Sequence, residues 1–541
     1  MLSRTRTIIF EYWWAFPLIS AMATAAIFLR APFSPLGVIF LRGPLFFLAL
    51  SGVVSPKKLF VAIFVFEAST TAVIPVATLS GFKWIPDAYL FTNMVHSSWF
   101  LLSLIVGFSA AVVMYVYALI ITPSNILNIL AAASATTLLE WALNYIFHGY
   151  NFGIAAITLS NIPSAIGLAS IGGMHLVSFV FYALTATLLS FFLHTLNVVP
   201  AHFDTARTPW WFLRTRGHII LIVLLLSALF FPFPSPRNQA RPVSIVIVQS
   251  QERGNGAYGT VDARGRFSFP LLEKSLESIY ATAPDIIIYP FSPVAGVFGE
   301  PNSLVKDGTV VGTYNALGSW LATRVLEKTH FVTWNSSLID DKFYNEFTYW
   351  EKGKLVGRYV KRNLFPFLDF TPSFSAQAGL YTTPYYVVEN TDATGIVTIG
   401  AYSLGNLVCS EIAVSSLARA DAPRSDFILS LGSEAMFTSP NFADFDMRSA
   451  ALRAVETGRP VVRANKLGPS AVIEASGRIS SFLARGESGI LTGTVIIPTV
   501  TSGATPYAKT GDIPILAGSF AVIFTAVLIS WNTRRKLALG R

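Results

Sequence analysis

The chain contains two kinds of sequence. One consists of long apolar runs, and the other consists of short apolar runs separated by polar residues. Each long apolar run is close to the roughly 20 residues that a helix needs to cross about 30 Å of hydrocarbon. Most of the runs precede residue 236, and one lies near the C-terminus. They predict membrane-spanning helices near residues 9–29, 35–54, 59–80, 96–121, 125–147, 171–195, 218–233 and 513–531.

The region between the last two runs has a different pattern. Short β-branched runs at 243–248 and 285–289 predict strands, and residues 271–280 and 449–457 predict helices. Strands that alternate with helices favour a layered α/β domain, and a region of this length buries a full core without disulfides. The sequence therefore predicts a membrane domain of about seven spans at 1–235, a soluble-type domain at 236–507, and a final span with a basic tail at 508–541.

Composition and charge add an orientation to this picture. Hydrophobic residues make up 53% of the chain, charged residues 13%, and the mean hydropathy is +0.55, as is typical of a membrane protein. Short loops that keep Lys and Arg face the cytoplasm. Basic clusters at 57–58, 207–216 and 534–541 all put both termini inside and region 236–507 outside. Since these basic residues flank spans, the net charge of +9 favours anionic lipid heads rather than nucleic acid as their partner.

A single thiol, Cys409, is the strongest chemical signal. It cannot form an intramolecular disulfide, so it either packs as a small hydrophobe or acts as a nucleophile. The acidic Glu411 two residues later and the upstream Lys361 favour the nucleophile. The sequence contains no metal-ligand cluster and no glycine-rich phosphate loop, so we expect no cofactor.

Short motifs follow one another in a fixed order along nearly the full chain. They are Glu140-Trp141, Gly149 to Phe152, Gly172-Gly173 with Ser178-Phe179, Val248-Gln249, Lys361-Arg362 with Pro366-Phe367, Val408 to Ile412, and Arg453 to Pro460. In this order they resemble the apolipoprotein N-acyltransferase family. The resemblance implies a polytopic α-helical membrane domain plus an extracytoplasmic nitrilase-like αββα sandwich in the bacterial inner membrane. It also implies a phospholipid acyl donor and an exported diacylglyceryl-lipoprotein acceptor.

The resemblance assigns roles to several residues of the outer domain. Cys409 takes the acyl group as a thioester, and Lys361 favours its thiolate. Lys361 and the backbone N–H of Ser410 stabilise the oxyanion, and Glu411 supports the same turn.

The chain departs from the family at the position of the base. Where the family has a glutamate after the proline that ends a strand, this chain has Phe291, which cannot accept a proton. The best remaining candidate base is Asp369, with Glu411 and Glu300 as further acidic groups.

Three functions remain open from the sequence. The first is the N-acyltransferase of lipoproteins with an altered base. The second is a non-catalytic relative that binds lipid or a lipidated peptide, which Phe291 favours. The third is an acyltransferase or amidase that acts on another exported substrate, such as a pilin-like peptide. Ser410 and residues 430–437 also differ from the family pattern, which leaves the acceptor open.

Overall fold

In a computed structural model the chain divides into two compact units. The first unit comprises residues 1–80, 92–233 and 510–541, and the second comprises 81–91 and 234–509. The structure describes residues 55–79, 104–116, 126–146, 148–149, 154–195, 211–230, 241–250, 260–261, 267–268, 276–277, 279–290, 298–299, 314–325, 328–339, 342–365, 369–370, 387, 394–433, 440–498 and 505–539.

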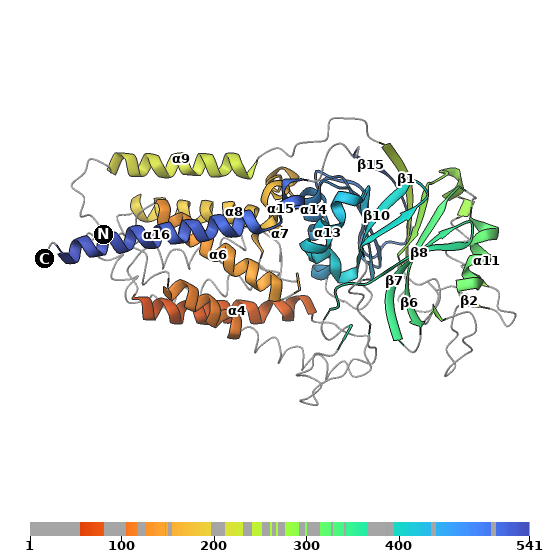
Figure 1. Cartoon of the computed structure of the whole chain (residues 1–541), viewed down its shortest axis with the longest axis horizontal. Coiled ribbons are helices and arrows are strands. Elements are labelled where there is room, and N and C mark those ends of the chain that lie inside the picture. The colour runs from red at the N-terminus through yellow and green to blue at the C-terminus, as the bar shows by residue number, and fades with distance from the viewer. Residues whose placement is uncertain are drawn as a thin grey trace, which may run out of the picture. The chain divides into compact units, whose positions relative to one another are not determined.

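The described part of the first unit is helical. Three of its helices are long and apolar enough to cross a membrane, at Ile126–Ile146, Ala169–Phe192 and Ile513–Asn532, and Leu104–Val116 and Gly217–Leu229 are shorter apolar helices. The full elements are α4 (Pro56–Leu79), α6 (Ile126–Ile146), α8 (Ala169–Thr195), α9 (Trp211–Leu229) and α16 (Ile513–Leu539), as drawn in Figure 1. Each predicted run from residue 59 onward thus contains a helix. The runs at 9–29 and 35–54 lie outside the described residues, and the number of spans stays a prediction.

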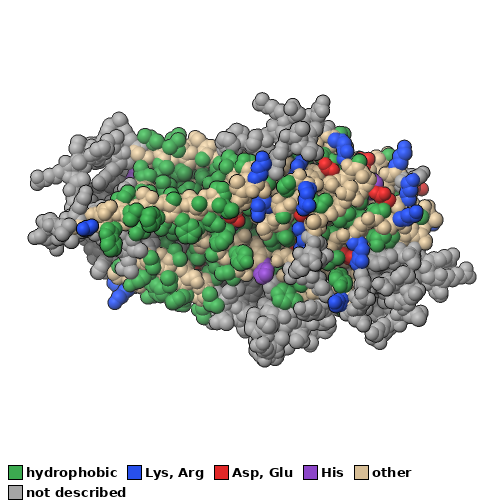
Figure 2. Space-filling view, in the orientation of Figure 1, with side chains coloured by type: hydrophobic (Ala, Val, Ile, Leu, Met, Phe, Trp, Pro, Cys, Tyr) green, Lys and Arg blue, Asp and Glu red, His purple; other side chains and the backbone are tan. Residues whose placement is uncertain are grey.

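The surface of these helices fits a lipid environment. Figure 2 shows hydrophobic side chains over much of the visible helical surface, whereas Lys, Arg, Asp and Glu gather over the second unit. Large apolar side chains on three different helices are exposed, namely Phe108, Ile220, Leu224, Phe520, Phe524 and Leu528. Exposed apolar surfaces of this kind occur where a protein contacts a membrane or another protein.

Helix α8 is broken near its start, and a folded segment that the apolar pattern did not predict precedes this helix. Gly173 has φ +72°, a left-handed conformation that glycine adopts without strain, so the helix path is interrupted there. The preceding residues form the short helix α7 (Ala155–Leu159) and the 3-10 helix η1 (Pro163–Ala165). Ile154 and Ile157 are fully or almost fully buried. Residues 154–160 and 165–170 are therefore buried, whereas 161, 162 and 164 between them are exposed.

Two β-sheets form the centre of the second unit. The first has the order β15-β1-β4-β6-β7-β8, with β5 beside β6, and the second has the order β14-β13-β12-β11-β10-β9. The strands of the first sheet are β1 (Arg241–Gln249), β4 (Ile286–Tyr289), β5 (Phe298–Gly299), β6 (His330–Ile339), β7 (Lys342–Glu351), β8 (Lys354–Val360) and β15 (Gly489–Ile497). Those of the second are β9 (Ile396–Ile399), β10 (Tyr402–Val408), β11 (Phe427–Ser433), β12 (Val461–Lys466), β13 (Ser470–Ile473) and β14 (Ile479–Leu483). A separate ribbon joins β2 (Thr260–Val261) and β3 (Phe267–Ser268).

The centre of each sheet is parallel. Strands β1, β4 and β6 pair in parallel in the first sheet, and β10, β11 and β12 do so in the second. The short strand β5 also pairs in parallel with β6, whereas the remaining strands pair antiparallel. Both sheets are therefore mixed, and functional side chains collect where their parallel strands end.

The core explains why the two sheets stack. Because side chains alternate along a strand, Val243, Ile245 and Ile247 of β1 face the second sheet, where they meet residues such as Leu404 and Leu429.

Helices cover the outer faces of both sheets. Helix α11 (Tyr314–Arg324) packs on the first sheet, and α13 (Ser415–Asp421) and α14 (Pro440–Thr457) pack on the second. The order helix, sheet, sheet, helix confirms the predicted αββα sandwich. The strands expected at 243–248 and 285–289 are β1 and β4, and the helix expected at 449–457 is the second half of α14.

Candidate active site

The Cys409 thiol lies in a strained turn at the end of a central strand. Strand β10 ends at Val408, and the 3-10 helix η4 (Cys409–Ala413) follows without a linker. Cys409 itself has φ +51°, a left-handed conformation that is uncommon for residues other than glycine. Strain of this type is retained where the surrounding contacts enforce it, and it is frequent at reactive residues. The residue is partly exposed.

Glu411 is the contact that enforces this turn. Its carboxylate is fully buried and accepts the Val408 N–H at 2.7 Å. It also accepts the hydroxyl of Tyr359 at 2.7 Å and the backbone N–H groups of Arg362 and Asn363 at 2.6 and 2.8 Å. Burial raises the pKa of Glu411 above its usual range, although these donors and the cations of Lys361 and Arg362 oppose the shift.

Lys361 follows directly on strand β8 and is held from both ends. Its backbone N–H donates to the Asn345 carbonyl at 2.9 Å, and its ammonium lies 2.5 Å from Oδ2 of Asp369. The residue is only 2% exposed. Burial alone lowers the pKa of Lys361, but Asp369, Cys409 and Glu411 outweigh it and raise the pKa. The ammonium therefore stays charged at neutral pH, within electrostatic reach of the Cys409 sulfur.

Asp369 is occupied by this lysine and its neighbours. Oδ2 accepts the Lys361 ammonium and the Phe365 N–H at 2.7 Å, and Oδ1 accepts the Asn345 side-chain amide at 3.1 Å. The geometry makes Asp369 the counter-ion of Lys361, a role that the sequence did not suggest. Its expected action as a base stays a prediction, and both Phe291 and Glu300 lie outside the described residues.

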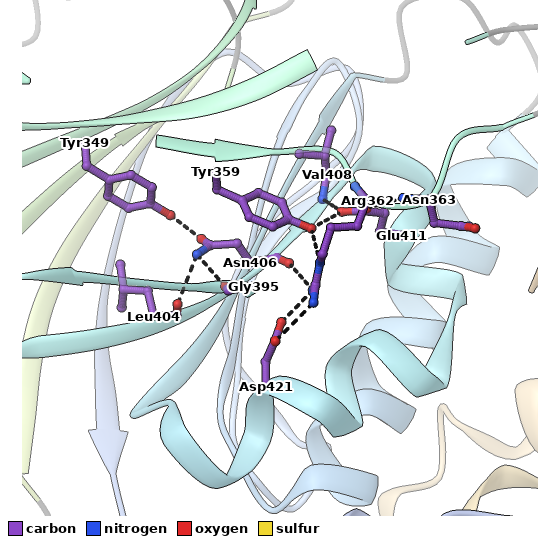
Figure 3. A network of polar contacts seen from close by, with 10 residues as sticks. All are labelled: Tyr349, Tyr359, Arg362, Asn363, Gly395, Leu404, Asn406, Val408, Glu411 and Asp421. Atoms are coloured by element: carbon purple, nitrogen blue, oxygen red, sulfur yellow. Dashed lines mark hydrogen bonds and ion pairs between the residues drawn. The ribbon is translucent and has the colours of Figure 1, made fainter. Parts of the chain in front are cut away.

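A second layer of polar contacts lies behind the cysteine turn and is drawn in Figure 3. The Arg362 guanidinium donates to both carboxylate oxygens of Asp421, at 3.2 and 2.6 Å, and to the Tyr359 hydroxyl at 2.9 Å. The Tyr349 hydroxyl donates to the side chain of Asn406, whose amide donates to the carbonyls of Gly395 and Leu404.

Sequence reasoning named Arg362 only as part of a motif and missed Tyr359, Asn406 and Asp421. An aspartate 59 positions from its arginine leaves no local signal. Within the described ranges, no group of three or more His, Cys, Asp or Glu side chains is placed to hold a metal ion.

The helical unit holds a separate buried polar cluster. Glu140 of α6 is 1% exposed and accepts the hydroxyl of Tyr182 at 2.6 Å and the backbone N–H of Ala155 at 3.1 Å. Nδ1 of His175 lies 3.0 Å from its other oxygen. The N–H of Ala156 donates to the Ser178 hydroxyl at 3.1 Å. These contacts attach the start of α7 to α6 and α8.

Known proteins match much of this chain in sequence. Residues 313–505 match the carbon–nitrogen hydrolase family. An apolipoprotein N-acyltransferase of Vibrio cholerae is 29% identical over 46% of this chain and 49% of its own length, so that match spans about half of the relative. A protein of the same name from Chromobacterium violaceum is 23% identical over 75% of this chain and 73% of its own length.

Solved structures were compared as well. An amidase from Nesterenkonia sp. is 16% identical, with a TM-score of 0.33 over 51% of this chain and 95% of that chain. The curated relatives extend across both units, and the matched family covers the region that contains Lys361 and Cys409. Residues 313–505 thus match the carbon–nitrogen hydrolase family, and the chain is similar to proteins named apolipoprotein N-acyltransferase.

Proposed function

We propose that this chain transfers an acyl group from a phospholipid to the N-terminal amine of an exported diacylglyceryl-lipoprotein, through a thioester on Cys409. One observation supports this proposal most: although burial lowers it, the charges of Asp369 and Cys409 raise the pKa of the buried Lys361 ammonium, and Cys409 itself lies in a strained turn. A nearby cation favours the thiolate, which is the nucleophilic form. The curated relatives named apolipoprotein N-acyltransferase support the substrate classes.

In the first step, the Cys409 sulfur bonds to the carbonyl carbon of a phospholipid ester. The negative charge that develops on the carbonyl oxygen is stabilised by the Lys361 ammonium and the Ser410 N–H, since a 3-10 helix leaves the N–H groups of its first turn without partners inside the helix. The carbon–oxygen bond then breaks. The lysophospholipid leaves as an alcohol with the proton that the thiol lost, and Asp369 is the candidate carrier of that proton.

In the second step, the acceptor amine attacks the thioester carbon. The carbon–sulfur bond breaks, an amide forms, and one amine proton returns to the sulfur of Cys409. The same Lys361 ammonium and Ser410 N–H stabilise the second oxyanion. Removal of one such donor typically costs about 3 kcal/mol of transition-state stabilisation.

The test is to trap the thioester. Purified protein incubated with phospholipid vesicles should acquire one acyl group that neutral hydroxylamine releases, and Cys409→Ala should acquire none. A second reaction with a diacylglyceryl peptide should move the label onto the peptide amine. A folded protein that binds the vesicles but never carries a thioester would refute the acyltransferase and support the lipid-binding alternative. A thioester that transfers to an exported peptide of another type, but not to this one, would refute the proposed acceptor.

The location of the site is part of the same proposal. The basic clusters at 57–58, 207–216 and 534–541 favour an inner-membrane protein with the second unit outside the cytoplasm. Reporter fusions near Pro200 and at Gly254 should report opposite compartments. If both reported the same side, the orientation and the access to exported lipoproteins would be wrong.

A further inference from the structure

One buried carboxylate joins the two turns on which the proposed chemistry depends. Oε2 of Glu411 accepts the N–H of Val408, which precedes the nucleophile. Oε1 accepts the N–H groups of Arg362 and Asn363, which follow Lys361. Glu411 therefore connects the backbone that follows Lys361 with the backbone that precedes Cys409.

The Arg362 side chain supports this carboxylate through a tyrosine. Its Nε donates to the Tyr359 hydroxyl at 2.9 Å, and the same hydroxyl donates to Glu411 at 2.7 Å. Its guanidinium carbon lies 5.3 Å from the centre of the Tyr359 ring. A path of contacts thus runs from Arg362 through Tyr359 to Glu411 and the nucleophile turn (Figure 3).

The guanidinium is itself fixed by strand β10 and helix α13. Two parallel hydrogen bonds join it to Asp421, and Nη2 also donates to the Asn406 carbonyl at 3.3 Å. Planar bidentate pairs of this kind fix orientation as well as charge, and an ammonium cannot reproduce them. Burial lowers the pKa of Arg362, but Tyr359 and Asp421 outweigh it and raise the pKa, so the charge persists. Burial and the neighbouring Glu411 raise the pKa of Tyr359, which keeps its donor proton.

The packing around this ion pair has no spare room. A Cβ atom added at Gly395 would lie well within 3.0 Å of both the Asp421 carboxylate and the Arg362 guanidinium. The Gly395 carbonyl accepts hydrogen bonds from the backbone and the side chain of Asn406, each at 2.9 Å. The ion pair of Arg362 and Asp421 is therefore packed directly against the backbone of Gly395.

We propose that Arg362 is a positioning residue: with Asp421 and Tyr359 it holds Glu411 so that the Lys361 ammonium remains beside the Cys409 sulfur. This inference rests on the proposed function for its consequence, because correct spacing matters for acyl transfer. Its geometry and its test need no lipid.

The test uses the fact that Cys409 is the only thiol in the chain, so alkylation by iodoacetamide reports one atom. Arg362→Lys keeps the charge and loses the paired geometry with Asp421. Tyr359→Phe removes only the hydroxyl that connects Arg362 to Glu411. The matched control is Arg358→Lys on the same strand, where Nε and Nη2 both lie 2.6 Å from the buried Glu346 carboxylate. Because strand side chains alternate, Arg358 points away from the face that carries Tyr359.

Arg362→Lys and Tyr359→Phe should each slow alkylation at pH 7.5 by about tenfold, since small displacements of reacting groups cost about this much or more. Both should also move the midpoint of the alkylation profile to higher pH. Arg358→Lys should stay within about twofold of the native rate, even at an equal loss of thermal stability. A general loss of packing would affect the control as much as the variants.

Wild-type alkylation in both folded variants would overturn the inference, as would an equal loss in the Arg358→Lys control. If Arg362→Lys does not fold, Tyr359→Phe decides alone, since it deletes a single oxygen and leaves Glu411 three donors. The proposed function fails separately. A protein that responds to these variants as expected, yet never carries an acyl thioester, would refute the acyltransferase and leave the positioning role intact.

Discussion

Oδ2 of Asp369 lies 2.5 Å from the ammonium of Lys361, and the same oxygen accepts the N–H of Phe365. The carboxylate is thus bound to the cation, which the Cys409 sulfur also influences. An acidic group in this position has two possible roles: it holds the lysine, or it carries the proton of the thiol. The two roles predict different behaviour toward reagents that require a proton carrier and reagents that do not.

Asp369→Asn should slow both acyl transfer to Cys409 and alkylation of Cys409 by about tenfold or more. The physical reason is that a buried cation without its carboxylate is strongly destabilised, so Lys361 moves or loses its charge. In alkylation the thiolate sulfur attacks the carbon of iodoacetamide and displaces iodide, so no general base is needed in that step. If Asp369→Asn slows acyl transfer while alkylation keeps its native rate, Asp369 is the base that the sequence suggested and the counter-ion role is secondary.

Lys361→Met, made together with Asp369→Asn to avoid an unpaired buried carboxylate, should move the midpoint of Cys409 alkylation to higher pH. The pKa of Lys361 is raised above 10.5, so its charge is constant between pH 6 and 9 and any titration there belongs to another group. Because the pKa of Lys361 is raised in the folded protein, the charged lysine contributes its full share to the free energy of unfolding below pH 10.5. This contribution is lost only as the pH rises through the pKa of the folded state. An unchanged midpoint would show that the cation does not favour the thiolate.

Periodicity predicted much of this fold because the signals are local. The β-branched runs correctly predicted β1 and β4, and the apolar runs correctly predicted α6, α8 and α16. The break at Gly173 was not predicted, since a run of apolar residues reads the same whether or not the helix is continuous. At the site, the resemblance paired Cys409 with Lys361. The partner of Arg362 could not be predicted, because Asp421 reaches it only when the end of β8 packs beside β10 and α13.

Gly395→Ala should destabilise the second unit by roughly 1–3 kcal/mol, the usual cost of overpacking a filled site. The added methyl group would displace Asp421 from Arg362. Thermal unfolding measures this loss of stability. Gly486→Ala is the control, because it shows whether a glycine elsewhere in this unit has the same effect when it is replaced by alanine. Gly486 has φ +81° and an open surrounding, so its cost is backbone strain without a clash. Slower alkylation of Cys409 in Gly395→Ala but not in Gly486→Ala is the expected result. Equal alkylation rates in the two variants would show that the packing at Gly395 does not affect the reactivity of Cys409.

Phe291→Glu should increase the rate of acyl transfer to Cys409, because it restores a carboxylate where the family resemblance puts the base. Phe291→Gln is the control, since it has the same length and polarity but cannot take the proton. The gain should grow with pH as the new group ionises, because only the ionised carboxylate accepts a proton. Equal rates in the Glu and Gln variants at every pH would show that position 291 does not supply the proton acceptor.

Glu140→Gln should loosen the attachment of α7 without removing α6 or α8. The carboxylate accepts the Ala155 N–H, the Tyr182 hydroxyl and a contact from His175, whereas the uncharged amide offers one acceptor oxygen in place of two. Ionisable groups inside apolar helices are costly to bury, and the contacts that Glu140 accepts offset this cost. Hydrogen exchange of the α7 amides in detergent should accelerate by about tenfold or more, with the centres of α6 and α8 unchanged.

The matched variant is Ser178→Ala, which removes the bond to the neighbouring Ala156 N–H and no charge. It should accelerate the same amides to a smaller extent, since a hydrogen bond to a charged acceptor is the stronger one. If exchange at α7 were unchanged in Glu140→Gln, or if all three helices loosened together, the cluster would serve the unit as a whole rather than the segment that begins at Ala155.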